Sequence, residues 1–178
     1  RIFRQATEAC SPYVPGCLIP SGGSWDWIHF HGRHAMERLT ERTALMHGIQ
    51  ESSSTRGTSS HQQNPSVILC EPDCTENSGA CIGAFLLYSG SFQTQIEVDQ
   101  LRQTRLVMGL HPDLFQWTLQ PNDTFATPEA VLSYSSNGLA QLSHHFHQVI
   151  REHICRGPWK HAKRPALINN WEATYFAF

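Results

Sequence analysis

The hydrophobic pattern of the chain has two periods, one typical of strands and one typical of a helix. In residues 92–98, apolar residues or threonine alternate with Gln and Glu, which is typical of a half-buried strand. Residues 82–88 are almost entirely apolar, which indicates a strand buried on both faces. The spacing between strand-like runs, about ten residues, favours an antiparallel β-sandwich and a mainly β fold. The other runs are residues 25–30, 67–69, 105–110, 115–119 and 130–134.

The period changes after residue 138, where apolar residues recur at steps of three and four. This spacing predicts one amphipathic helix. Ser136 or Asn137 can cap its start, and Gly157 followed by Pro158 is expected to end it. The apolar stripe consists of Leu139, Leu142, Phe146, Val149 and Ile150.

Two segments are predicted to lie outside regular structure, and a third is ambiguous. Residues 1–24 are rich in Pro and Gly, which favours turns over the interior of an element. Residues 51–65 are polar and rich in Ser and Thr, and they are predicted to form a loop. Residues 33–46 contain helix-favouring types, but Thr40 and Thr43 interrupt them and the apolar positions do not form one stripe.

A further strand-forming run lies near the end of the sequence, at residues 166–168. Polar and aromatic residues follow it directly, and in a (β/α)8 barrel the carboxyl ends of the strands carry the active site. Because the chain begins at Arg1 and stops within an aromatic run, we expect a piece of a longer protein. The predicted organisation is a partial β-sandwich domain over residues 1–136, a linker helix and loop over 137–164, and the truncated first strand of a (β/α)8 barrel over 165–178.

Composition and charge argue against two classes of partner. The 178 residues are 40% apolar, which is enough for a core, and only 16% are charged. A formal net charge of −2 argues against a nucleic-acid partner that is bound through bulk positive charge. The apolar runs fall far short of the roughly 20 residues that span a bilayer, so no membrane partner is expected.

Cysteine and histidine are the residues that could hold a metal. The cysteines could be reduced thiols, zinc ligands or disulfide partners, and their low density favours reduced, metal-free thiols. Among eleven histidines, His144 and His147 share one face of the predicted helix. A polar helix face is favoured there over a metal site, and the sequence has no HExxH motif. The six cysteines are Cys10, Cys17, Cys70, Cys74, Cys81 and Cys155.

Four segments together resemble one family, the glycoside hydrolase family 36 α-galactosidases. LINNWEATYF at residues 167–176 is similar to the start of the family's catalytic barrel, and STRGTSSHQQNP at residues 54–65 is a second match. YSGSFQTQIEVDQ at residues 88–100 and TPEAVLSYSSNGL at residues 127–139 resemble its β-sandwich, a supersandwich. The four motifs occur in the family's order. For residues 32–39 the resemblance implies sandwich strand and loop instead of helix.

The resemblance also implies an activity for the parent protein. Members of this family remove terminal α-linked galactose from melibiose, raffinose and stachyose, and many also transglycosylate. They retain anomeric configuration through an aspartate nucleophile and an aspartate acid/base. Both aspartates lie on later barrel strands, so we expect no catalytic residue in this chain and no activity from it alone. The family further implies no organic cofactor, no catalytic metal, a homotetramer and a location in the bacterial cytoplasm.

The end of the chain carries the first candidates for substrate contact. Trp171 is expected to stack on a galactose face, and the alternative is a core tryptophan between sandwich and barrel. Asn170, together with Asn169, could line the pocket or satisfy backbone groups at the strand end. Glu172 could contact sugar or make an interdomain hydrogen bond. Ala177 departs from the YFDF ending usual in the family and removes a polar group from the barrel strand.

Further candidates lie upstream. Arg56, His61 and Asn64 belong to the polar loop, which could line a sugar pocket or form a hydrogen-bonded Ω-loop at a subunit contact. His34 stands where many family members have tryptophan in a loop that reaches the substrate pocket, so it is a candidate for substrate contact. Two other functions stay open, a non-catalytic carbohydrate-binding sandwich and an oligomerisation module.

Overall fold

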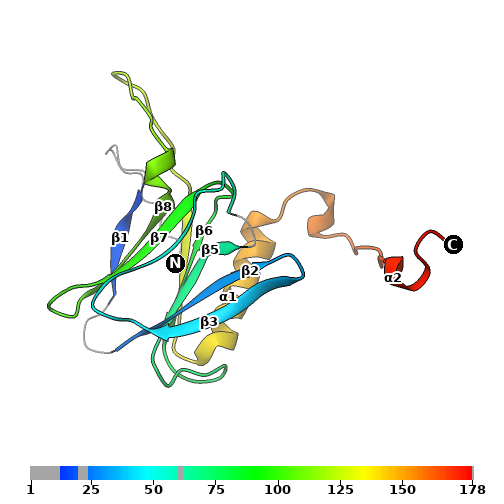
Figure 1. The fold of residues 1–178 in the computed structure, drawn as a ribbon, viewed down its shortest axis with the longest axis horizontal. Coiled ribbons are helices and arrows are strands. Elements are labelled where there is room, and N and C mark those ends of the chain that lie inside the picture. Colours follow the sequence, from blue (N-terminus) through cyan, green and yellow to red (C-terminus); the bar gives the residue numbers. More distant parts are fainter. Residues whose placement is uncertain (1–12, 20–23, 60–61, 178) are drawn as a thin grey trace. The chain divides into compact units, whose positions relative to one another are not determined.

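The chain is described by a computed structural model that covers residues 13–19, 24–59 and 62–177. It divides into two compact units, residues 1–144 and residues 145–178. The first unit contains two antiparallel β-sheets and the beginning of a helix (Figure 1). The predicted mainly β sandwich followed by a linker helix is therefore confirmed.

The described residues form nine strands, and every pair of neighbouring strands is antiparallel. Across the four-stranded sheet lie β1 (Tyr13–Ile19), β8 (Thr104–Leu110), β7 (Phe92–Val98) and β4 (Gly48–Ser54), in that order. Across the five-stranded sheet lie β3 (Met36–Ala44), β2 (Asp26–Arg33), β5 (Gln63–Cys70), β6 (Cys81–Leu86) and β9 (Ala130–Ser135).

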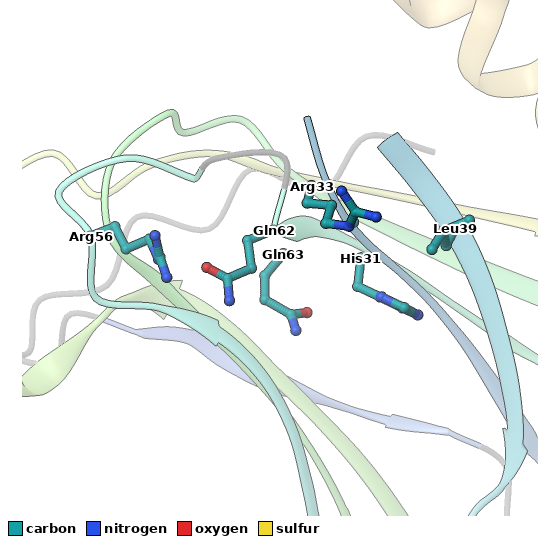
Figure 2. Close-up of a pocket in the computed structure, with 7 residues that line it drawn as sticks. His31, Arg33, Leu39, Arg56, Gln62 and Gln63 are labelled. Carbon is teal, nitrogen blue, oxygen red and sulfur yellow. The ribbon is translucent and has the colours of Figure 1, made fainter. Parts of the chain in front are cut away.

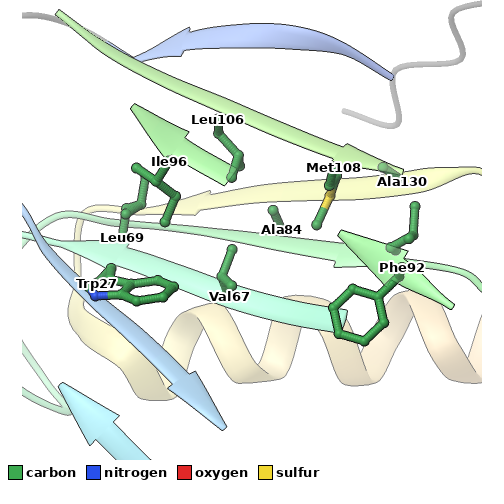
Figure 3. Packing of buried hydrophobic residues seen from close by; sticks show 10 residues of the cluster. Trp27, Val67, Leu69, Ala84, Phe92, Ile96, Leu106, Met108 and Ala130 are labelled. Atoms are coloured by element: carbon green, nitrogen blue, oxygen red, sulfur yellow. The ribbon is translucent and has the colours of Figure 1, made fainter. Parts of the chain in front are cut away.

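The hydrophobic core lies between the two sheets (Figure 3). Phe92 and Ile96 of β7 are fully buried and belong to one cluster with Val67 and Leu69 of β5. The alternation seen in residues 92–98 therefore marks which face of β7 turns inward, because side chains of a strand alternate between its two faces. The rest of the cluster is Trp27, Ala84, Leu86, Leu106, Met108 and Ala130.

Most strand predictions are confirmed. The apolar run at residues 82–88 contains β6, where the neighbours Gly83 and Ala84 are both buried although they point to opposite faces. The ambiguous residues 33–46 form the end of β2, a turn and β3. The resemblance therefore predicted this hairpin correctly, and local helix propensity was overridden by pairing of β3 with β2.

Two predictions of irregular structure were wrong. The Pro- and Gly-rich residues 1–24 include β1, an edge strand whose ladder with β8 shifts register between Val14 and Cys17. That irregularity accommodates Pro15, since bulges and sheet edges tolerate proline. The polar residues 51–65 contain the end of β4 and the start of β5, so the loop prediction was wrong for residues 51–54 and 63–65. Serines occupy the buried positions of β4, which hides the strand from a hydrophobicity pattern.

The strand predicted at residues 115–119 was also wrong. These residues have no ladder partner in the described part of the chain and form one limb of an excursion between β8 and β9. It follows a short 3-10 helix, η1 (Pro112–Leu114), and rises from the sandwich (Figure 1). We call residues 115–125 the aromatic arm. Its alternating aromatic residues pack on Phe125 instead of on a sheet.

Helix α1 (Gly138–Val149) begins against the loop that joins β5 to β6, residues 71–80. Carbonyl groups of this loop accept the first backbone N–H groups of the helix, so neither Ser136 nor Asn137 is needed as a cap. The three hydrogen bonds run from Gly138 to Gly79 at 2.9 Å, from Leu139 to Thr75 at 3.0 Å and from Ala140 to Glu76 at 2.9 Å.

The second unit continues the helix through a π-helical turn, η2 (Ile150–Ile154), a 3-10 turn, η3 (Pro158–Lys160), and a short helix, α2 (Trp171–Thr174). The helical residues end at Ile154, three positions before the predicted stop at Gly157, and Cys155 there already has extended backbone. The run at residues 166–168 pairs with no strand in the described part of the chain, and Leu167 is 93% exposed. A strand needs neighbouring strands, and this unit supplies no partner among its described residues.

Candidate functional site

The first unit contains an open pocket of about 610 Å³ (Figure 2). In the view of Figure 2, two glutamine side chains lie between Arg56 on one side and residues of the β2–β3 hairpin on the other. The pocket is lined by His31, Gly32, Arg33, Leu39, Arg56, Gln62 and Gln63.

Strand register explains why these residues meet. His31 of β2 lies opposite Leu39 of β3 and opposite Gln63 of β5, so the three side chains project from one face of the sheet. Both ladders of β2 shift register next to His31, and such bulges often re-aim side chains near functional sites. At Gly32 a Cβ atom would overlap the carbonyl oxygen of Met36, so only glycine fits the close approach of β3 there.

Hydrogen bonds hold the other wall, where residues 55–59 follow β4 as a loop. Ser54 Oγ donates to the carbonyl of Thr58 at 2.6 Å, and the backbone N–H of Gly57 donates to Ser91 Oγ at 2.8 Å. Ser52 Oγ donates to Gln63 Oε1 at 3.0 Å and thereby ties β4 to β5 under the pocket. Arg56 is therefore carried by an anchored loop.

A row of titratable groups lies beside the pocket, on β2 and β3. Nε2 of His29 and Nε2 of His31 are each 3.5 Å from Glu41 Oε2. The His29 ring stacks on Trp27 with centroids 4.3 Å apart, and its buried Nδ1 has no hydrogen-bond partner among the described residues. Burial lowers the pKa of His29, and although Glu41 works in the opposite direction, burial prevails.

The chemistry of the lining suits binding and not bond cleavage. Guanidinium, amide and imidazole groups offer hydrogen bonds to hydroxyl or anionic groups, and Leu39 adds an apolar contact. Retaining glycosidases need two carboxyl groups about 5 Å apart, and none of the residues lining this pocket is Asp or Glu.

The structure distributes the five predicted contact residues over several places. Arg56 lines the pocket. His34 lies at the tip of the β2–β3 hairpin, where its side chain is 97% exposed, and it is not among the pocket residues. His61 lies outside the described residues. Trp171 and Asn170 belong to the second unit.

In the second unit, Trp171 is 47% exposed and packs edge-on against Phe176, with ring centroids 4.7 Å apart. The carbonyl of Asn170 accepts hydrogen bonds from the N–H of Ala173 and of Thr174. Asn169 Oδ1 accepts from the N–H of Trp171 at 3.1 Å, which is the backbone role expected for an asparagine in this segment.

Sequence reasoning missed His31, Arg33, Gln62 and Gln63 as pocket residues. His31 and Arg33 could have been found from the sequence, because alternation along a strand places every second residue on one face. The contribution of Gln63 depended on pairing between β2 and β5, which local patterns do not contain. Asn64, a predicted loop residue, instead lies in β5, where its Oδ1 accepts from the N–H of Ser66 at 3.1 Å.

No metal centre emerges from the described residues, since none of their His, Cys, Asp and Glu groups is arranged in a set of three that could hold an ion. Cys70, Cys74 and Cys81 are buried free thiols, and Cys155 is a half-buried one. Burial raises the pKa of Cys70 to about 11 and that of Cys81 to about 12, so both are protonated at neutral pH. In the described part of the chain, no helix has the length and apolar character needed to cross a membrane.

The fold and the pocket define a β-sandwich module that leads through a helix into a second domain. Residues 17–120 match the family model of the glycosyl hydrolase family 36 N-terminal domain, and residues 124–178 match the melibiase model. The chain belongs to glycosyl hydrolase family 36.

Individual relatives agree with this assignment. The chain is 48% identical, over 99% of its length, to 18% of the bifunctional alpha-galactosidase/sucrose kinase AgaSK of Mediterraneibacter gnavus. It is also similar to two crystal structures of the GH36 alpha-galactosidase AgaA from Geobacillus stearothermophilus, in complex with stachyose and with raffinose. For each structure the TM-score is 0.85 at 45% identity, over 92% of this chain and 23% of that one. The chain thus spans about a fifth of the length of these relatives.

Proposed function

We propose that this chain is part of an α-galactosidase that removes terminal α-galactosyl groups from oligosaccharides such as raffinose, stachyose and melibiose. The observation that carries the proposal is the succession of the two family models along one chain, the sandwich domain followed directly by the start of the melibiase domain. Relatives that match this chain are named alpha-galactosidases, and one of them, AgaA, was crystallised with stachyose and with raffinose.

In the proposed mechanism, catalysis is retaining and uses two aspartates located in the melibiase domain outside these residues. The pocket of the first unit has no carboxylate in its lining, which is consistent with a supporting role in binding. We assign Trp171, Asn170, His34, Arg56 and His61 to substrate contact in the complete enzyme. We further propose that this enzyme is a homotetramer of the bacterial cytoplasm that works without cofactor or metal.

The test is an activity assay on two proteins, the complete gene product and the isolated chain of 178 residues. We expect the complete protein to hydrolyse a nitrophenyl α-galactoside and to release galactose from raffinose with retained configuration. We expect no turnover from the isolated chain, because its carboxyl groups do not form the required pair in the pocket. A complete protein that is folded but inert toward α-galactosides would contradict the proposal and would favour a non-catalytic sandwich.

Residue roles are tested in the complete protein. Trp171→Ala is expected to lower kcat/KM, because the variant loses one aromatic contact. The loss should correspond to about 1–3 kcal/mol of transition-state stabilisation. Trp159→Ala is the matched control, because Trp159 is a similarly exposed tryptophan of the same unit, at 54%, and is not a contact candidate. Equal kcat/KM values for the two variants would remove Trp171 from the binding site.

A further inference from the structure

The aromatic arm presents apolar rings away from the core of the sandwich. Phe125 lies between two other rings, with centroid distances of 5.3 Å to Phe115 and 5.2 Å to Trp117. Phe115 and Phe125 are half-buried, but Trp117 is 60% exposed. A cluster with its largest ring outermost leaves apolar surface in water that the sandwich itself does not cover.

The arm is closed at its tip and anchored at its base by hydrogen bonds. At the tip, the N–H of Gln120 donates to Asp123 Oδ2 at 3.1 Å, and the N–H of Asp123 donates to the carbonyl of Gln120 at 3.0 Å. At the base, the N–H of Leu87 donates to the carbonyl of Glu129 at 2.8 Å. Between tip and base no β-ladder links the limbs within the described residues, and the rings of Phe115 and Trp117 on one limb pack on Phe125 of the other.

The size of the exposed patch decides what kind of partner it suits. One aromatic side chain can bury about 150–250 Å², and a stable contact between two separate proteins buries about 800 Å² on each side. One largely exposed ring and two half-buried rings offer less than that. A partner within the same polypeptide needs no such area, because it has already lost its independent translation and rotation.

We propose that the aromatic arm docks onto the part of the melibiase domain that lies outside these 178 residues. The sandwich family model ends at residue 120 and the melibiase model begins at residue 124, so the arm holds the boundary between them at its tip. This inference rests on the proposed function: in an α-galactosidase of which this chain is about a fifth, as it is of its relatives, most of the melibiase domain lies outside these residues and is available to cover the patch.

The chemistry of the arm also fits a buried intrachain contact. The neighbours of Trp117 are Gln116 and Thr118, and residues 115–125 contain no Lys or Arg. Neutral polar groups around an aromatic centre are the usual surroundings of a permanent interface, whereas basic groups would favour an anionic partner. Trp117 is therefore the anchor that inserts into the surface of the melibiase domain.

The first experiment measures the accessibility of Trp117 in the complete protein by hydroxyl-radical oxidation with mass spectrometry. An exposed tryptophan peptide sets the free rate, and Trp27, which is buried in the core, sets the protected rate. A side chain that is 60% exposed would react at close to the free rate, whereas docking should slow Trp117 by about fivefold or more. Oxidation within twofold of the free rate would overturn the proposal.

The second experiment identifies the partner by hydrogen exchange in complete proteins that carry Trp117→Ala or the control Gln116→Ala. We expect the tryptophan variant to speed exchange in one surface segment of the melibiase domain by about tenfold, and the glutamine variant to leave it unchanged. The protection of Trp117 from oxidation and the faster exchange in the Trp117→Ala variant should both be independent of protein concentration. Protection of Trp117 that disappears on dilution would show a second copy as the occupant and overturn the assignment. Neither readout requires α-galactosidase activity, so the proposed function and the docking proposal can fail separately.

Discussion

The loop of residues 71–80 and the aromatic arm both leave the sandwich between strands, yet they are held in different ways. The Arg42 guanidinium donates to Asp26 Oδ2 and to the carbonyls of three residues in the loop, at 2.8–2.9 Å. The arm instead exposes Trp117 and has no ladder between its limbs among the described residues. The three carbonyl acceptors in the loop belong to Glu71, Pro72 and Cys74.

The loop forms its stabilising contacts within this chain, whereas the arm exposes apolar surface that a partner could cover. In the loop, polar groups are paired with neighbours that this chain provides, including the start of α1. In the arm, Trp117 leaves apolar surface exposed to water. Contact with another apolar surface would be favourable, because it would remove that surface from water. Substitutions in the loop should therefore act on the stability of the sandwich, and substitutions in the arm should act where its partner is present.

The largest effect is expected at the contact between the loop and α1. A Cβ atom on Gly138 would lie 2.6 Å from the backbone nitrogen of Ser78, and Gly138 has φ 82°. Gly57 has a similar φ of 76° but open space around it, so Gly57→Ala is the matched control. We expect Gly138→Ala to destabilise the protein by about 1–3 kcal/mol more than the control, the cost of overpacking. Equal urea midpoints for the two variants would show that the loop shifts to accommodate the added methyl group at residue 138.

The next effect concerns the guanidinium that braces the loop. Arg42→Met removes the donor to three carbonyls and leaves Asp26 without its partner, so we expect a loss of about 2 kcal/mol in the free energy of unfolding. Arg105→Met is the control, because Arg105 forms an exposed ion pair with Glu97 and should cost less than about 1 kcal/mol. Denaturant titration of both variants gives the comparison. A loss at Arg42 no greater than at Arg105 would mean that the brace contributes little.

Acid should weaken the hairpin that carries Arg42. Burial holds the pKa of His29 below its ordinary value of 6.5 in the folded protein, so the unfolded chain takes up this proton first. The stabilising contribution is thus present above pH 6.5 and is lost as the pH falls toward the lower, folded pKa. Thermal midpoints between pH 7.5 and 5 measure it. His29→Gln should flatten this slope, and His34→Gln, at a side chain that is 97% exposed, should leave it unchanged.

The smallest effect is expected for the arm when its partner is absent. In the isolated 178-residue chain, Trp117→Ala should change the free energy of unfolding by no more than about 0.5 kcal/mol, as is usual for exposed positions. The measurement is chemical denaturation of the isolated chain beside its Trp117→Ala form. If the free energy of unfolding fell by about 2 kcal/mol, Trp117 would contribute to the core of the sandwich itself. The arm would then be held within this chain, as the loop is.

Local pattern revealed those elements whose burial falls on apolar residues. Strands β2, β6, β7, β8 and β9 and the second half of β5 follow from alternation or from apolar runs, and helix α1 follows from steps of three and four. Strand β4 was hidden because Ser52 and Ser54 occupy its buried positions, and β1 because it tolerates Pro15 at a bulge. The alternating aromatic residues of the arm misled in the other direction, since they pack on Phe125 and not on a sheet.

The candidate site was less accessible from sequence than the fold. Arg56 was found through its motif, but its neighbours His31 and Gln63 meet only through the register of β2 with β5. Register joins residues that are far apart along the chain, and no local spacing contains it. The helix cap had the same cause, because the acceptors for the first N–H groups of α1 come from a distant loop.

The contact between residues 71–80 and α1 also sets an order of events in folding. The carbonyls that accept hydrogen bonds from the N–H groups of Gly138, Leu139 and Ala140 are in place only after β5 and β6 have paired around their loop. A helix nucleus is costly, and a template that already presents acceptors removes part of this barrier. During synthesis the template leaves the ribosome well before the helix does. We therefore expect pulse-labelled hydrogen exchange to show protection in β5 and β6 ahead of the first turn of α1, and simultaneous or reversed protection would refute this order.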